Sequence, residues 1–203
     1  MKKLIVCCFA TIFALSAVAQ PQLTPKNIDK VIKAMTLEEK AHLVVGGRHL
    51  EQNKDMAGEV GYTGRIIPGA AGVTYPIPRL GIPAIVLADG PAGLRIAPTR
   101  KGDSQTYYCT GFPVGIHLAS TWNDEIIYNV GEAMGQEVKE YGVDILLAPG
   151  VNIMRNPLCG RNFEYYSEDP LLAGKTADRK RLVDCRLQIT DYRLQIIASD
   201  FDN

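Results

Sequence analysis

This chain of 203 residues lacks a net charge, because 22 basic side chains balance 22 acidic ones. A chain without net charge has no electrostatic footprint for nucleic acid or for an anionic membrane, so we expect neither as a partner. Histidine is scarce as well, and the three that occur are scattered along the sequence at His42, His49 and His117. That spacing is a poor signal for a metal site.

Cysteine is too rare for a disulfide framework. Of the five cysteines, Cys7 and Cys8 lie in an N-terminal segment that we expect to be removed, which leaves Cys109, Cys159 and Cys185. Three is an odd number and does not indicate a disulfide scaffold. Cys109 and Cys159 both lie near predicted loops, so a bridge between them in an oxidising compartment and two free thiols stay open as alternatives.

The N-terminal segment, residues 1–19, has the pattern of a secretory signal. Lys2 and Lys3 precede an apolar stretch over residues 4–15, and small residues at 17–19 form a cleavage site. A membrane anchor is the competing interpretation, but the apolar stretch is too short to span a bilayer of about 30 Å. We expect export to the periplasm or the extracellular space, with a mature chain that begins near Gln20.

Two short apolar runs, at residues 84–88 and 143–148, predict buried parallel strands. Polar side chains follow each run at once. In parallel α/β folds, ligands bind at the carboxyl ends of the strands. The runs therefore lead to one candidate site, whose residues are Asp89, Arg95, Arg161 and Glu164.

Helical spacing of apolar residues predicts three helices. The first begins at the N-cap Thr24, and the second has a capping box at residues 36–39 and ends at Gly46 and Gly47. The third is capped by Asn123 or Asp124 and ends at Gly142.

Residues 112–118 look like one more strand, directly before the third helix. Strand, helix and strand with short links form the βαβ unit of a parallel sheet. The fold class is therefore α/β, the N-terminal part of a (β/α)8 TIM barrel. We expect the barrel to be incomplete, since a whole one takes about 250 residues.

Two polar stretches without periodicity predict loops. Residues 58–78, which include Tyr62, Arg65 and Tyr75, are rich in glycine and proline and indicate a surface loop, which can also line a cleft. The stretch at residues 97–104 has the length of a rim loop that could shape a substrate pocket.

With both strand ends in view, the chain resembles the N-terminal catalytic domain of the family 3 glycoside hydrolases, which are β-glucosidase-like and β-xylosidase-like enzymes. The resemblance covers roughly residues 23–176. Its motifs, in chain order, are Met35-Thr36-Leu37-Glu38-Glu39-Lys40, Ala88-Asp89-Gly90-Pro91-Ala92-Gly93-Leu94-Arg95, Phe112-Pro113, Gly160-Arg161-Asn162-Phe163-Glu164 and Ser167-Glu168-Asp169-Pro170. Four motifs in the family's order, of which the last has two parts, are hard to obtain by coincidence. The resemblance implies a β-linked oligosaccharide or glycoside as substrate and no cofactor.

Asp89 is the first candidate for binding sugar. A carboxylate at a strand end can accept charge-assisted hydrogen bonds from two neighbouring hydroxyls of a pyranose ring. The resemblance implies that Asp89 binds the non-reducing sugar in the subsite before the cleaved bond. The alternative is a turn aspartate that satisfies local backbone N–H groups.

Arg161 carries a fixed fork of donors that suits a carboxylate or sugar oxygens, and the resemblance implies contact with sugar hydroxyls. Glu164 is better interpreted as the orienting partner of Arg161 than as a catalytic acid, because a buried arginine beside a pocket needs a counter-charge. Arg95 is a further candidate for sugar binding, with an ordinary surface salt bridge as the alternative.

No catalytic residue is assigned in this chain. The retaining mechanism implied by the resemblance uses an aspartate nucleophile on a later barrel strand and a separate acid/base, and neither position is present. The family's Lys-His pair is also missing, since no histidine here follows a lysine. Glu168 and Asp169 are adjacent and point apart, so they cannot flank one bond; the resemblance implies that this segment starts the next helix.

After Thr176 the sequence changes character, so residues 177–203 are expected to be an anomalous tail. It contains two near copies, residues 186–189 and 193–196, which are too few for a coiled coil. Our hypothesis is out-of-frame or foreign sequence; if the tail is native, it covers a sheet edge. The function expected from the resemblance is hydrolysis of terminal β-D-glycosidic bonds. We expect the truncated chain itself to be inactive. A non-catalytic carbohydrate-binding remnant and a non-functional gene fragment are the alternatives.

Overall fold

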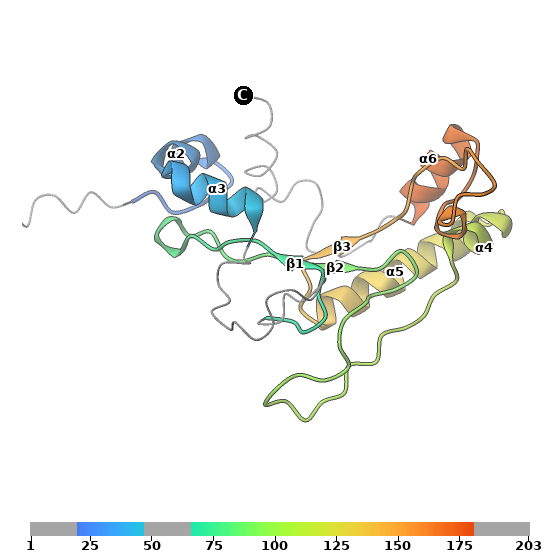
Figure 1. The fold of residues 1–203 in the computed structure, drawn as a ribbon, viewed down its shortest axis with the longest axis horizontal. Coiled ribbons are helices and arrows are strands. Elements are labelled where there is room, and N and C mark those ends of the chain that lie inside the picture. Colours follow the sequence, from blue (N-terminus) through green and yellow to red (C-terminus); the bar gives the residue numbers. More distant parts are fainter. Residues whose placement is uncertain (1–19, 47–65, 181–203) are drawn as a thin grey trace, which may run out of the picture.

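The computed structural model describes residues 20–46 and 66–180. The expected signal, His49, Tyr62, Arg65 and most of the expected tail lie outside the described residues. Within them the chain is a mixed α/β unit, with α2 and α3 at one end of the strands and α4 and α6 at the other (Figure 1).

Two helices open the described chain, α2 (Ile28–Ala34) and α3 (Leu37–Val45). The predicted capping box at the start of α3 is confirmed: Thr36 Oγ1 accepts from the Glu39 N–H, and the Glu39 side chain accepts from the Thr36 N–H. Gly46 ends α3 with φ +96°, as the sequence predicts.

The predicted start of the first helix at Thr24 is wrong. The N-cap is Asn27, whose side chain accepts from the Thr24 N–H at 2.8 Å and donates to the Gln22 carbonyl at 2.7 Å. These bonds close a turn around Pro25 and delay the helix by three residues.

The sheet has three strands in the order β1 (Gly72–Val73), β2 (Val86–Asp89) and β3 (Ile145–Leu147). β2 and β3 are parallel, with Asp89 opposite Leu147, which agrees with the prediction of two parallel strands; their direct pairing was not predicted. β1 pairs antiparallel with β2 and lies within the stretch predicted as a loop. Two residues are too few to show strand alternation in the sequence.

The strand predicted at residues 112–118 is wrong, because this stretch forms helix α4 (Gly115–Ser120). Its buried residues, Gly115, Leu118 and Ala119, recur at helical spacing, and Pro113 cannot donate to a strand ladder. His117 is accordingly on an exposed helix face and not in a strand.

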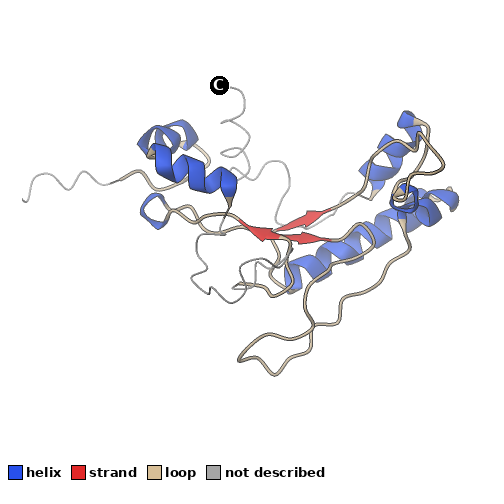
Figure 2. Cartoon of the chain, viewed as in Figure 1, coloured by secondary structure: helices blue, strands red, loops and turns tan. Residues whose placement is uncertain are grey.

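Helix α5 (Asp124–Glu140) is the predicted third helix and leads into β3, but α4 precedes it in place of the predicted strand, so the connection from β2 to β3 contains both helices. Asn123 caps α5, accepting from the backbone N–H groups of Glu125 and Ile126. Its apolar face packs on the sheet in the main core, and the red strands of Figure 2 lie alongside this helix. The main core consists of Ile67, Ala70, Val86, Ala88, Leu94, Met134, Val138, Val143 and Leu146.

After β3 the chain forms a short 3-10 turn, η4 (Asn162–Glu164), and then α6 (Pro170–Arg179). Asp169 caps α6 by accepting from the N–H groups of Leu171 and Leu172, so the segment starts the helix as expected. The helix continues for three residues beyond Thr176.

The polar stretch at residues 97–104 does not line the pocket described below. It packs against the end of α5, where Arg100 donates to the Tyr141 carbonyl at 2.8 Å and stacks on the Tyr107 ring at 3.7 Å. Cys109 and Cys159 are both free thiols. No helix in the described part of the chain has the length and apolarity to cross a membrane.

Candidate functional site

Asp89 is the last residue of β2 and stands at the carboxyl end of the parallel pair. The chain then turns tightly, with Gly93 N–H donating to the Gly90 carbonyl at 3.3 Å. A Cβ on Gly90 would lie 2.3 Å from the Gly93 oxygen, so only glycine permits this turn. The turn then returns beside the strand, where the Arg95 N–H donates to the Asp89 carbonyl at 2.9 Å.

The Asp89 carboxylate is half exposed and only loosely paired. Arg95 Nη1 lies 3.6 Å from Asp89 Oδ2, and the Arg95 side chain is 81% exposed. Exposed pairs of this kind contribute little to stability. The Asp89 oxygens are therefore accessible to hydroxyl donors of a ligand, and Arg95 lies beside them.

Arg161 and Glu164 form the predicted ion pair in two parallel hydrogen bonds. Nε donates to Oε1 at 2.9 Å and Nη2 donates to Oε2 at 3.0 Å. The hydrogen bond from Arg161 holds the pKa of Glu164 below its usual value, although burial acts in the opposite direction. The same pairing raises the pKa of Arg161, and the negative charge of Asp89 adds to that rise.

The expectation that Arg161 is buried is wrong, since its side chain is 68% exposed. Glu164 is the less exposed member of the pair, at 13%. The short helical turn η4 places the two residues three apart on one side, which brings the fork of donors onto the carboxylate. Arg161 is thus oriented from the inside by Glu164 while part of its guanidinium stays accessible.

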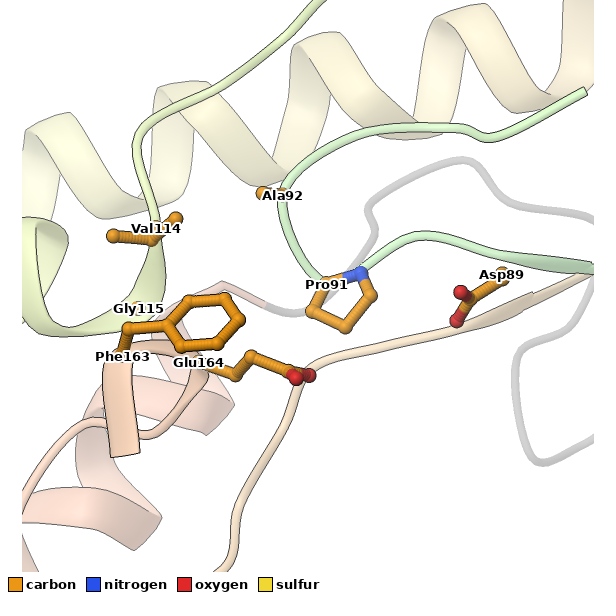
Figure 3. A pocket seen from close by; sticks show the side chains of 7 residues that line it. All are labelled: Asp89, Pro91, Ala92, Val114, Gly115, Phe163 and Glu164. Atoms are coloured by element: carbon orange, nitrogen blue, oxygen red, sulfur yellow. The ribbon is translucent and has the colours of Figure 1, made fainter. Parts of the chain in front are cut away.

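Helix α4 fixes the position of Glu164 from the other side. A Cβ on Gly115 would lie 2.2 Å from the Glu164 carbonyl oxygen, so the close approach of α4 to η4 depends on glycine. A pocket of about 130 Å³ opens between these elements and the turn after β2. Figure 3 shows the residues that line it: Asp89, Pro91, Ala92, Val114, Gly115, Phe163 and Glu164.

Of the four candidate residues, Asp89 and Glu164 line this pocket, and Arg95 and Arg161 reach it only through their ion pairs with these two carboxylates. Glu168 and Asp169 do not line the pocket. The Asp169 side chain instead accepts the hydrogen bonds that cap α6. Among the described residues no group of histidine, cysteine, aspartate or glutamate could hold a metal ion. The site therefore offers charged hydrogen-bonding groups next to an apolar wall, an arrangement that suits a small polar ligand with apolar faces.

Sequence reasoning missed two contributions to this site. Phe163 lines the pocket from inside a motif that was interpreted only for its charged residues. Lys180 is 1% exposed, and its Nζ donates to the Pro91 carbonyl at 2.7 Å, which ties the end of α6 to the turn after Asp89. The sequence gives no signal for this contact, because the two residues are 89 apart.

Two parallel strands with a half-exposed carboxylate and a partly apolar pocket at their carboxyl end place the chain among α/β proteins, in which ligand sites commonly lie at strand ends. Comparison with known families makes this class specific. The glycosyl hydrolase family 3 N terminal domain matches residues 70–183, more than half of the chain. The chain belongs to this family.

Individual relatives agree with that assignment. The thermostable beta-glucosidase B of Acetivibrio thermocellus is 41% identical over 157 residues, which cover 74% of this chain and 18% of that protein. An exo-alpha-(1->6)-L-arabinopyranosidase of Bifidobacterium longum is also 41% identical, over 72% of this chain and 17% of the relative.

Solved structures agree as well. Beta-glucosidase 3B from Thermotoga neapolitana in complex with glucose matches with a TM-score of 0.66 and 57% identity, over 76% of this chain and 21% of that one. The chain thus spans about a fifth of the length of these proteins.

Proposed function

We propose that this chain carries the first part of the sugar-binding site of a β-glucosidase-like glycoside hydrolase, built on the N-terminal part of a (β/α)8 barrel. The relatives named β-glucosidase and the glucose complex of the Thermotoga enzyme support a terminal β-linked glucose as the ligand. The relative named as an arabinopyranosidase makes another pyranose the next choice. The reaction of the whole protein is retaining hydrolysis of the glycosidic bond in carbohydrate breakdown.

The observation that carries this proposal is the half-exposed Asp89 carboxylate at a strand end, beside the Arg161–Glu164 pair. Asp89 accepts hydrogen bonds from two adjacent sugar hydroxyls, and the accessible part of the Arg161 guanidinium donates to a third oxygen. Arg95 completes the positive side of the site. Since Glu164 already holds Arg161 in place, little ordering is required when the sugar binds.

Binding of this kind contributes to catalysis where the contacts strengthen as the transition state forms. The nucleophile and the acid/base are assigned to no residue of this chain. The proposal includes export through residues 1–19, supported by Lys2, Lys3 and the apolar stretch that follows. It includes no cofactor and no nucleic-acid partner.

A graft tests the proposal. Residues 20–180 replace the matching segment of Thermotoga neapolitana beta-glucosidase 3B, and hydrolysis of an aryl β-glucoside is measured. We expect the graft to hydrolyse the substrate far faster than buffer does. We expect Asp89→Ala in the graft to lower kcat/KM by about a hundredfold or more, because two charge-assisted hydrogen bonds are lost.

Asp103→Ala is the matched control, since Asp103 lies on the loop that packs at the end of α5 and away from the pocket. It should leave kcat/KM of the graft unchanged. An inactive graft, or an Asp89→Ala graft as active as its parent, contradicts the proposal.

Non-catalytic carbohydrate binding is the second candidate. It is favoured by one observation: the sugar-binding residues are present, whereas no histidine in the chain follows a lysine as the family's Lys-His pair requires. Glucose binding by the chain itself, without hydrolysis of an aryl β-glucoside, is the result expected from this candidate.

A further inference from the structure

Phe163 lines the pocket and is not part of the buried core. Its side chain is 51% exposed, whereas the nearby Tyr165 and Tyr166 are buried, at 7% and 4% exposed. The turn η4 is held by other contacts, namely the Arg161–Glu164 pair and the hydrogen bond from Asn162 Nδ2 to the Asn156 carbonyl at 2.8 Å. The Phe163 ring is therefore not packed in the core and can contact a ligand in the pocket.

The pocket is apolar at one end and charged at the other. In Figure 3 the Phe163 ring lies beside Val114 and Gly115 and across from Pro91, whereas the Asp89 carboxylate stands at the far end. The Glu164 carboxylate lies between these ends, and Arg161 already occupies its oxygens. Asp89 is thus the lining carboxylate that remains open to a ligand.

A pyranose has this same division of surface. Its equatorial hydroxyls lie around the edge of the ring, and its axial C–H groups form apolar faces. A ligand that hydrogen-bonds Asp89 through two edge hydroxyls presents a ring face to the side wall of the pocket. An aromatic ring packs well against the C–H face of a pyranose, because both surfaces are apolar and flat and their contact removes apolar area from water.

We infer that Phe163 is a further sugar-binding residue, which packs on the C–H face of the same sugar whose hydroxyls Asp89 accepts. This inference rests on the proposed function and adds a specificity rule to it. Ligands with both adjacent hydroxyls and a ring face use Asp89 and Phe163 together. Ligands with hydroxyls alone use Asp89 and gain nothing from Phe163.

Ligand-observed saturation-transfer NMR on the full chain at micromolar concentration tests the rule, with glucose and glycerol as the two probes. Glycerol has adjacent hydroxyls and no ring face. We expect Phe163→Ala to weaken glucose binding by about threefold to tenfold and to leave glycerol binding unchanged. Phe163→Tyr retains the ring and should bind glucose like the wild type.

Two control variants separate the possible failures. Tyr108→Ala removes another exposed aromatic ring, at 77% exposed, and should change neither ligand. Asp89→Ala should weaken both ligands. Unchanged glucose binding in Phe163→Ala, or an equal loss of both ligands, overturns the role of Phe163 while the proposed function stands. A wild-type chain that binds no glucose, or an Asp89→Ala variant that binds it normally, overturns the proposed function and this inference with it.

Discussion

Arg161 and Glu164 show how two charged residues divide one task. Glu164 is 13% exposed and both of its carboxylate oxygens accept from Arg161, so it orients the more exposed Arg161 although it also lines the pocket. Such a pair forms between residues three apart only when the backbone turns helically, as it does in η4. The orientation of Arg161 is thus set before any sugar arrives.

Glu164→Gln is expected to weaken glucose binding by about threefold to tenfold, because the amide has one oxygen and no charge with which to hold the guanidinium. Equilibrium dialysis with labelled glucose measures the change. Glu168→Gln, an exposed neighbour outside the pocket, is the control and should bind like the wild type. Equal affinities for all three proteins would show that Arg161 needs no orienting partner.

Lys180 makes the stability of the chain depend on pH. Burial lowers the pKa of its ammonium group to about 8, from 10.5 for an ordinary lysine. The folded state therefore releases this proton at a lower pH than the unfolded state does, and the free energy of unfolding rises as the pH climbs through 8. Urea unfolding should show this rise between about pH 7.5 and about pH 9, below the range in which tyrosines ionise.

Lys180→Met removes the titrating group and should flatten the pH dependence in that window. A wild-type chain with no rise, or a variant that retains the full rise, would show that the Lys180 ammonium is not the source. The variant also loses the hydrogen bond to the Pro91 carbonyl, so its effect at a single pH is not diagnostic.

At the scale of helices and strands, local sequence signals determined the outcome where they were strong. The capping box at Thr36, the Asn123 cap and the Asp169–Pro170 start of α6 were all predictable, because each is a contact between residues two or three apart. The two parallel strands β2 and β3 were predictable from their apolar runs, whereas their direct pairing was not, since a strand at residues 112–118 was expected between them in the chain.

Some predictions failed because of tertiary contacts, whereas the start of α2 was displaced by local hydrogen bonds of Asn27. Residues 112–118 look apolar enough for a strand, but residues 115–120 form α4, whose buried residues have helical spacing and whose Gly115 packs closely on the Glu164 carbonyl. The antiparallel strand β1 exists only because β2 lies next to it. The apolar wall of the site was likewise beyond the sequence, since Pro91, Val114 and Phe163 meet only after folding.

The contact between α4 and η4 gives a prediction at this scale. Gly115→Ala places a methyl group against the Glu164 carbonyl oxygen and should destabilise the chain by about 1–3 kcal/mol in urea unfolding. Gly160→Ala is the matched control, because a Cβ there meets nothing within 4 Å. Equal stability of the two variants would mean that α4 does not pack closely on η4.

At the scale of the whole molecule, the exposed edge of the sheet at β3 determines whether the chain associates with other copies. In the described part of the chain, β3 pairs with β2 alone, and Leu147 on this strand is 45% exposed. A strand edge of this kind pairs readily with another copy. We therefore expect concentration-dependent self-association of the chain, detected by light scattering after size exclusion.

Leu147→Lys should reduce this association, because a charge on an edge strand opposes pairing with a second copy. Ile126→Lys, on the exposed side of α5, adds the same charge away from the sheet edge and is the control. A wild-type chain that stays monomeric at high concentration would show that the β3 edge is covered.

The measurement that decides most is the dissociation constant of D-glucose for the full chain and for Asp89→Ala, determined side by side by equilibrium dialysis at a concentration where the chain is monomeric. We expect saturable binding by the wild type and a loss of at least about tenfold in the variant, since a charged acceptor of two hydroxyls is removed. No binding by a folded wild-type chain, or equal binding by both proteins, would contradict the assignment of this strand end as a sugar site.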